Sequence, residues 1–291
     1  MRWCASRAVR GAFADRRAEG YLGPMTSTGG PPTEDAAPTA GDAAPIRVRR
    51  NPAGIIRIAH RGASSRAPEN THAAFAAALE LGVDAIELDC QLSADGELVV
   101  IHDETLERTT SGLGPVGAKP WRELAMLDAG GWWDSRFRGE RIPRLADVLA
   151  QIAGRVMLNV EIKSARDVGV IEAKLAALVG TASASDWVLF SSFHEPALRN
   201  LRAVAPWAAI GVLWDRRPAS GALTLAADIG ARCIAPGRRI VDDLLVGAAH
   251  AQSLGVWVWT VNDVGEMRRL VAAGVDGLFS DYPERLAALR G

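Results

Sequence analysis

The sequence predicts an α/β protein, a (β/α)8 or TIM barrel with a small insertion after the third strand. From Ile55 to the C-terminus, short β-like runs alternate with Ala- and Leu-rich stretches of helical period. Eight or so such units occupy about 240 residues, which is a usual length for this barrel. A doubly wound sheet is the weaker alternative, because no GxGxxG motif follows the first run.

The predicted strands are one too many for the barrel. They are residues 55–59, 85–90, 97–102, 156–162, 187–192, 208–213, 232–235, 256–261 and 277–280. The second and third runs are separated only by QLSADG, which is too short for a helical crossover between parallel strands. We therefore expect one of the nine runs to be an extension or a terminal addition.

Helix candidates lie between most of these runs. The first, residues 71–81, begins after Pro68-Glu69-Asn70 and ends at Gly82. The last, residues 263–273, is followed by Gly274, a residue type that commonly ends helices. The others lie near residues 145–153, 167–179, 195–204, 219–229 and 241–254.

The N-terminal segment differs in composition from the rest of the chain. Residues 25–54 are rich in Pro, Gly, Thr, Ala and Asp, and Met25 is a second plausible start. We expect residues 1–54 to be a disordered or wrongly assigned extension and residues 55–291 to form the barrel domain. Residues 103–142 have little periodic signal, and we interpret them as a functional insertion.

Charge and cysteine content exclude several classes of protein. Lys+Arg is 33 and Asp+Glu is 34, so no basic excess exists to hold nucleic acid or an anionic membrane. The three cysteines, Cys4, Cys90 and Cys233, form neither a disulfide framework nor a CxxC site. No apolar run approaches the ~18 residues of a membrane span, and no signal-peptide core is present. We expect a cytoplasmic protein, and the sequence contains no oligomeric signal.

Ionisable residues gather at the ends of the first four predicted strands. In a barrel of this type the site lies at the carboxyl ends of the strands. Side chains alternate along a strand, so Glu87 and Asp89 share one face, as do Glu161 and Lys163. The strand ends carry His60-Arg61-Gly62, Glu87-Leu88-Asp89, His102-Asp103 and Glu161-Ile162-Lys163.

This set of residues suits a metal-bound phosphodiester. Three carboxylates at the barrel mouth repel one another unless a cation joins them, and Mg²⁺ or Ca²⁺ (or Mn²⁺) takes oxygen ligands. With a dication, Arg61 and Lys163, the assembly carries one positive charge, which a single phosphodiester would neutralise. His60 and His102 supply the acid and base that hydrolysis needs. Arg61 offers a bidentate fork for phosphate.

Each residue taken alone has a simpler interpretation. A single strand-end histidine is more often a satisfied polar residue, and His72, His194 and His250 belong to that class. Lys163 could be a structural partner of Glu161, and Trp259 could belong to the core. The coincidence of all these residues at successive strand ends favours the functional interpretation.

The motifs together resemble those of the glycerophosphodiester phosphodiesterases. The resemblance runs from about Ile56 to Leu289, nearly the whole predicted domain. It rests on HRG (60–62), PENT (68–71), ELD (87–89), VVIHDETLERTT (99–110), NVEIK (159–163), WTVND (259–263) and DGLFSDYP (276–283).

The resemblance implies a TIM barrel that hydrolyses glycerophosphodiesters, a small-molecule substrate, to sn-glycerol 3-phosphate and an alcohol. It implies one bound divalent cation and a role for each motif residue. Glu69 and Asn70 would support the Arg61 loop. The implied roles are metal ligation by Glu87, Asp89 and Glu161, acid/base catalysis by His60 and His102, phosphate binding by Arg61 and Lys163, and contact with the glycerol or alcohol by Trp259 and Phe193.

Several alternatives stay open at this point. Attack could be by water or by the glycerol 2-hydroxyl through a cyclic phosphate, and either histidine could be the acid. The substrate could instead be a lysophospholipid, if Trp132, Trp133 and Phe137 form an apolar groove rather than the core of the insertion. A glycosidase using Glu87 and Glu161, or a non-catalytic phosphate-binding barrel, is less favoured.

Overall fold

The computed structural model describes residues 54–163, 166–287 and 289. The chain divides into two units, Met1–Ala37 and Pro38–Gly291. The first unit lies wholly outside the described residues, so the following description concerns the second. The predicted N-terminal extension, residues 1–54, also falls outside them except for its last residue, and its disorder stays a prediction.

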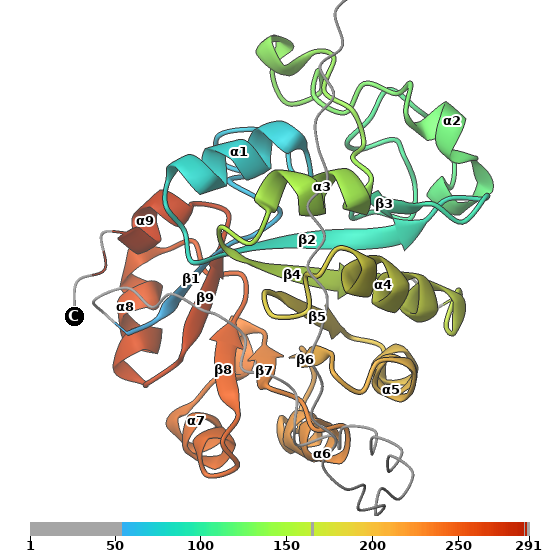
Figure 1. The fold of residues 1–291 in the computed structure, drawn as a ribbon. Helices are drawn as coiled ribbons and strands as arrows, with labels where there is room; N and C mark the ends of the chain where they lie inside the picture. Colours follow the sequence, from blue (N-terminus) through green and yellow to red (C-terminus); the bar gives the residue numbers. More distant parts are fainter. Residues whose placement is uncertain (1–53, 164–165, 288, 290–291) are drawn as a thin grey trace, which may run out of the picture. The chain divides into compact units, whose positions relative to one another are not determined.

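The described part of the chain forms a closed barrel of eight parallel strands, as predicted (Figure 1). The closure is made by β1, which pairs in parallel with both β9 and β2. The barrel strands are β1 (Ile56–Ala59), β2 (Ala85–Leu92), β4 (Met157–Ile162), β5 (Val188–Ser192), β6 (Ala209–Trp214), β7 (Cys233–Pro236), β8 (Gly255–Val258) and β9 (Gly277–Ser280).

Each of the seven predicted helical stretches contains a helix. The helices are α1 (His72–Glu80), α3 (Leu145–Ile152), α4 (Val170–Thr181), α5 (Glu195–Val204), α6 (Ser220–Asp228), α7 (Asp243–His250) and α8 (Val264–Ala272). Polar caps start several of them: the side chains of Thr71, Asp242 and Asp263 each accept a hydrogen bond from a backbone N–H of the first turn. Sequence periodicity did not predict two short helices, α2 (Trp121–Leu124) and α9 (Pro283–Ala287).

The surplus run is the third one. Strand β3 (Leu98–Val100) pairs antiparallel with β2 and is not part of the parallel barrel. The six residues between the two runs allow only a hairpin, so the chain reverses instead of crossing over. His102 therefore does not follow a barrel strand, as its place in the sequence suggested, but follows the return arm of this hairpin.

The hairpin explains how two histidines distant in sequence approach one place. β1 pairs with residues 85–86 of β2 and β3 pairs with residues 90–92, both on the edge opposite β4. Because β1 runs parallel to β2 and β3 antiparallel, the carboxyl ends of β1 and β3 face each other along this edge. His60 follows β1 and His102 follows β3, so both arrive beside the segment Glu87–Asp89.

The insertion after β3 has a small core of its own. It contains two 3₁₀ turns, Val116–Ala118 and Ser135–Phe137, together with α2. Three aromatic residues were considered above either as a groove or as the core of the insertion, namely Trp132, Trp133 and Phe137. None of them belongs to this core, and Trp132 is 41% exposed. The core consists of Val99, Ile101, Leu106, Val116, Leu124, Ala129 and Ile142.

Apolar side chains fill the barrel below the site. The inner core includes Ile58, Met157, Leu189 and Phe279, and a larger core lies between the strands and the helices. The described cysteines, Cys90 and Cys233, are buried free thiols. Within the described residues, no helix is long and apolar enough to cross a membrane. The cytoplasmic location stays a prediction.

Arg57 and Asp84 join β1 to the turn before β2 in a nearly buried ion pair. The Arg57 backbone N–H and Nε donate to Asp84 Oδ2 at 2.9 and 2.8 Å, and Nη2 donates to Oδ1 at 3.0 Å. The Asp84 side chain is only 4% exposed. Removing one partner of such a pair leaves the other charge without compensation.

We predict that Asp84→Ala lowers the free energy of unfolding by about 3 kcal/mol in urea denaturation. The matched control is Asp147→Ala, because Asp147 makes an equally short but exposed pair with Arg144. That substitution should cost no more than about 1 kcal/mol. Equal effects of the two substitutions would contradict this explanation of how β1 is held.

Candidate active site

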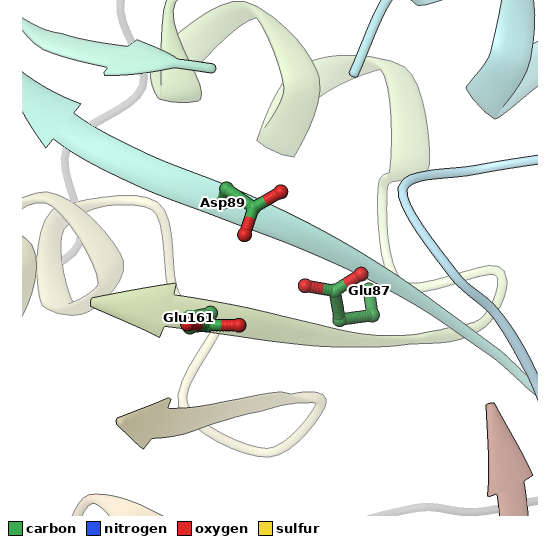
Figure 2. A group of neighbouring side chains, drawn as sticks. All are labelled: Glu87, Asp89 and Glu161. Atoms are coloured by element: carbon green, nitrogen blue, oxygen red, sulfur yellow. The ribbon is translucent and has the colours of Figure 1, made fainter. Parts of the chain in front are cut away.

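Three carboxylates from two neighbouring strands converge inside the barrel mouth (Figure 2). Glu87 and Asp89 lie on β2, Glu161 lies on β4, and the register pairs Asp89 directly with Glu161. One oxygen of each lies within 4.8 Å of the others, and all three residues are buried. Alternation along two parallel strands in register therefore places the three negative charges in one small volume.

The carboxylates cannot all be ionised without compensation. Burial, together with the charge of Asp89, raises the pKa of Glu87 to about 8 and also raises the pKa of Glu161. Burial opposes ionisation of Asp89 as well, but Arg61 and Lys163 outweigh it and lower the pKa of Asp89. Without a further cation, the cluster therefore retains a proton near neutral pH.

Two basic side chains flank the cluster. Lys163 Nζ lies 2.9 Å from Glu161 Oε1 and 3.6 Å from Asp89 Oδ1. Arg61 Nε lies 3.4 Å from Asp89 Oδ2, and the Arg61 backbone N–H donates to Glu87 Oε2 at 2.8 Å. Arg61 has a φ of 57°, in the left-handed region. Lys163 thus pairs with Glu161, as the structural interpretation expected, and also borders the open space of the site.

The carboxylate set fits a hard divalent cation. Glu87 Oε1 and Asp89 Oδ1 are buried and accept no hydrogen bond, so their lone pairs are available to a ligand. The 4.8 Å limit on the oxygen separations is about twice a calcium–oxygen bond of 2.3–2.6 Å, and a small contraction would suit Mg²⁺. Asn70, from the PENT motif, donates to the other oxygen of Asp89 at 2.8 Å and orients it.

Both histidines are held at Nδ1 by a carboxylate. His60 Nδ1 lies 2.6 Å from Asp281 Oδ1, and His102 Nδ1 lies 2.6 Å from Asp103 Oδ1. A proton on each Nδ1 satisfies these contacts, which assigns the free lone pair of each neutral ring to Nε2. His60 Nε2 lies 4.0 Å from Glu87 Oε2.

The two imidazoles have opposite electrostatic environments. Burial would lower the pKa of His60, but the hydrogen bond with Asp281 and the charge of Glu87 outweigh it and raise that pKa. Burial and the charges of Arg61 and Lys163 lower the pKa of His102, and together they outweigh the opposing effects of Asp89 and Asp103. Two histidines with unequal proton affinities suit a pair in which one donates a proton and the other accepts one.

Asp281 is a site residue that sequence analysis missed. It directly follows β9, and Asn262 donates to its second oxygen at 2.7 Å. Asp281 is 221 positions from His60, so no local pattern joins them. The signal was nevertheless available, because Asp281 is an ionisable residue at the carboxyl end of a barrel strand, the criterion that identified the other site residues.

A cavity of about 100 Å³ opens onto these groups. Phe193 and Trp259 form one wall, with their rings edge to face at 5.2 Å. The Trp259 indole N–H donates to the Ala235 carbonyl at 2.7 Å, so Trp259 offers the cavity only apolar surface. Seven predicted site residues line it, namely His60, Arg61, Glu87, His102, Glu161, Lys163 and Trp259, whereas the eighth, Asp89, lies buried behind them.

The remaining candidates lie elsewhere. His72 Nδ1 is 2.6 Å from Gln151 Oε1, and His250 Nε2 is 2.9 Å from Asp276 Oδ2. Neither lines this cavity, in agreement with their assignment to the structural class. The described residues that line it do not include Trp132, Trp133 or Phe137.

A family model matches this constellation. Residues 60–285 match the glycerophosphoryl diester phosphodiesterase family, a span that contains every residue of the site. The chain belongs to this family. The resemblance seen in the motifs is thereby confirmed, as is the prediction that the chain is an enzyme of the phosphoric diester hydrolase class.

Relatives within the family are similar over most of their length. A glycerophosphodiester phosphodiesterase of Caldanaerobacter subterraneus subsp. tengcongensis is 40% identical over 241 residues, which are 80% of this chain and 96% of that protein. A glycerophosphodiester phosphodiesterase structure from Agrobacterium tumefaciens is 36% identical, with a TM-score of 0.73 over 81% of this chain and 100% of that chain.

A third relative was solved with a ligand. The structure of a phosphodiesterase from Oleispira antarctica in complex with the product sn-glycerol-3-phosphate has a TM-score of 0.73 at 32% identity, covering 79% of this chain and 94% of that chain. The likeness covers most of both chains, so it concerns the fold as a whole.

We predict that Ca²⁺ or Mg²⁺ raises the melting temperature, because a bound cation removes the repulsion within the carboxylate cluster. At one hundred times its dissociation constant, the ion should stabilise the fold by about 2.7 kcal/mol. Glu87→Gln should lose this response while staying close to wild type in stability without metal at neutral pH, since the Glu87 carboxyl, with its pKa raised to about 8, is then already protonated. A Glu87→Gln protein that keeps the full response would exclude this site.

Proposed function

We propose that the protein hydrolyses glycerophosphodiesters to sn-glycerol 3-phosphate and an alcohol, with one divalent cation held by Glu87, Asp89 and Glu161. The observation that carries the proposal is one cavity lined by two Nδ1-anchored histidines and by part of a buried acidic cluster flanked by Arg61 and Lys163. The product found in the Oleispira antarctica relative agrees with it.

The charges of the site match this substrate. When all three carboxylates are ionised, they and Arg61 and Lys163 sum to a net charge of −1, which a dication would change to +1 and a phosphodiester would then neutralise. The bound cation supplies Lewis-acid stabilisation of negative charge on the phosphoryl oxygens. The donor set is all carboxylate oxygen, which suits Mg²⁺, Ca²⁺ or Mn²⁺.

Arg61 and Lys163 bind the phosphoryl oxygens. Arg61 Nε lies 3.4 Å from Asp89 Oδ2 and Glu69 holds Nη1 at 2.8 Å, so the guanidinium is held in one orientation in the lining of the cavity. Lys163 Nζ makes one short contact, with Glu161, and has further donor capacity at the edge of the cavity. Cationic donors held in place act most strongly on charge that develops during the reaction.

His60 and His102 move the protons. The Nε2 of one histidine accepts the proton of the attacking hydroxyl, and the Nε2 of the other donates a proton to the departing alkoxide. Asp281 and Asp103 keep the two rings oriented and stabilise the imidazolium as it forms. The attacking hydroxyl is that of water or the glycerol 2-hydroxyl, and the second route passes through a cyclic phosphate.

The shape of the cavity restricts what enters it. Its volume of about 100 Å³ is well below the range of about 300–1,000 Å³ for sites that take drug-sized ligands. The Trp259 and Phe193 wall provides apolar contact for the carbon chain of glycerol. We propose that the glycerophosphate part enters this cavity and that the alcohol part extends outside it.

We predict that the protein releases sn-glycerol 3-phosphate and choline from glycerophosphocholine, as measured by phosphorus NMR. EDTA should stop the release, and added Mg²⁺, Ca²⁺ or Mn²⁺ should restore it. A transient cyclic phosphate signal would identify attack by the glycerol 2-hydroxyl. Turnover that resists EDTA, or release of phosphocholine and glycerol instead, would contradict the proposed metal dependence or the proposed bond cleavage.

We predict that His60→Ala and His102→Ala each lower kcat by about 10²–10⁴-fold, the range expected for loss of an acid or a base. The control is His250→Ala, which removes another histidine–aspartate pair but one outside the cavity, and it should keep the wild-type rate. With a nitrophenyl diester, whose leaving group needs no proton, only the variant lacking the acid should recover. Residual activity above ~10% in both variants would exclude the acid/base assignment.

A further inference from the structure

One arginine of the insertion makes four hydrogen bonds to two carboxylates at the rim of the site. Arg108 donates from Nε and Nη2 to the two oxygens of Asp103, at 2.6 and 2.9 Å. It also donates from Nη1 and Nη2 to the two oxygens of Glu69, at 2.8 Å each. Both pairs are bidentate, which is the strongest geometry available to an arginine and a carboxylate.

Each of these carboxylates holds a different residue of the site. Asp103 Oδ1 lies 2.6 Å from His102 Nδ1, and Glu69 Oε1 accepts from Arg61 Nη1 at 2.8 Å. A continuous chain of charged hydrogen bonds therefore runs from His102 through Asp103, Arg108 and Glu69 to Arg61. Arg108 is its central member and belongs neither to the cavity lining nor to the acidic cluster.

We infer that Arg108 is a positioning residue that sets the imidazole of His102 and the guanidinium of Arg61 relative to each other. The inference rests on the proposed function and adds to it a role for the insertion. His102 follows β3 and Arg61 follows β1, and among the described strands these two pair with β2 but not with each other. Arg108 provides that link.

The insertion holds Arg108 from behind. Leu106 is fully buried in the core of the insertion, and the Thr110 hydroxyl donates to the Leu106 carbonyl at 2.7 Å. The Gly112 N–H then donates to the Thr110 hydroxyl at 2.9 Å. The turn that carries Arg108 is therefore held in place by contacts both before and after it in the chain. These contacts explain how the Arg108 side chain can keep one orientation although it is 43% exposed.

The charges of this chain support the same role. The hydrogen bonds from Arg108 lower the pKa of Asp103 by more than burial raises it. Burial would raise the pKa of Glu69, but Arg108 and Arg61 outweigh it and lower that pKa too. Both carboxylates therefore stay ionised and keep their hold on His102 and Arg61. A lysine could not do this, because it lacks the planar fork that bonds two carboxylates at once.

The inference separates activity from stability. Ion pairs of exposed side chains stabilise the fold only weakly, and Arg108 is 43% exposed, so Arg108→Ala should melt close to wild type. Loss of a partner that orients active groups typically costs about 10- to 100-fold in activity. We therefore expect kcat/KM for glycerophosphocholine to fall by about 10- to 100-fold in Arg108→Ala, with little change in melting temperature.

The matched control is Arg144→Ala. Arg144 is 40% exposed and bonds both oxygens of Asp147 at 2.9 and 3.0 Å, but it lies outside the site. This variant should keep wild-type kinetics with a similar small change in melting temperature. Guanidinium at a non-denaturing concentration should restore part of the rate of Arg108→Ala and should leave the rate of Arg144→Ala unchanged. Arg108→Lys should stay impaired, since it keeps the charge and loses the fork.

Two further variants resolve the two arms of the chain. Asp103→Asn acts on His102 and should mainly lower kcat, whereas Glu69→Gln acts on Arg61 and should mainly raise KM. Arg108→Ala should do both. Adding either substitution to Arg108→Ala should cost less than the product of the single effects, because members of one network do not act independently.

The outcomes are distinguishable from failure of the proposed function. If wild type releases no sn-glycerol 3-phosphate, the proposed function fails, and nitrogen NMR of the His102 ring still tests whether Arg108→Ala alters its Nδ1-protonated state. If wild type is active, unchanged kinetics in Arg108→Ala would overturn the inference. So would a loss that guanidinium does not restore and that follows a fall in melting temperature. If Arg108→Ala does not fold, the Arg108→Lys kinetics decide.

Discussion

The structure depends on electrostatic compensation for three carboxylates that strand register places together. Glu87 and Asp89 on β2 and Glu161 on β4 point into the same buried volume because neighbouring parallel strands run in register. Burying three negative charges is unfavourable. Arg61 and Lys163 flank the cluster and offset part of this cost, and the pKa of Glu87 rises to about 8. In the proposed function, a divalent cation would complete the compensation, and an anionic diester would then complete the charge balance.

The rest of the site is assembled around one edge of β2. That edge is shared by β1 and by the return arm of a hairpin, whose carboxyl ends meet beside the acidic cluster. Each arm delivers one histidine, and each histidine is held at Nδ1 by a carboxylate from another place, Asp281 after β9 or Asp103 in the insertion. The proposed chemistry thus relies on a small irregularity in a regular barrel, a third strand that forms a hairpin with β2 before the chain reaches α3.

Much of this arrangement could be predicted from sequence, and the exceptions have physical reasons. The carboxylates were identifiable because side-chain alternation within one strand is a local rule. The identity of the surplus strand was not, since the short link QLSADG requires a hairpin without showing which of its two arms belongs to the barrel. Asp281 and Arg108 act through partners 221 and 39 positions away, and only the closed barrel and the packed insertion bring such pairs together. Composition and periodicity contain no record of those contacts.

The most direct test of the central claim is an anomalous-difference map from crystals of the full chain grown with Mn²⁺. We predict one strong peak between Glu87, Asp89 and Glu161, with carboxylate oxygens at the short distances usual for an octahedral ion and with Arg61 and Lys163 at its edge. A barrel mouth without a peak, in crystals whose protein hydrolyses glycerophosphocholine, would contradict the claim that these three carboxylates exist to hold a cation.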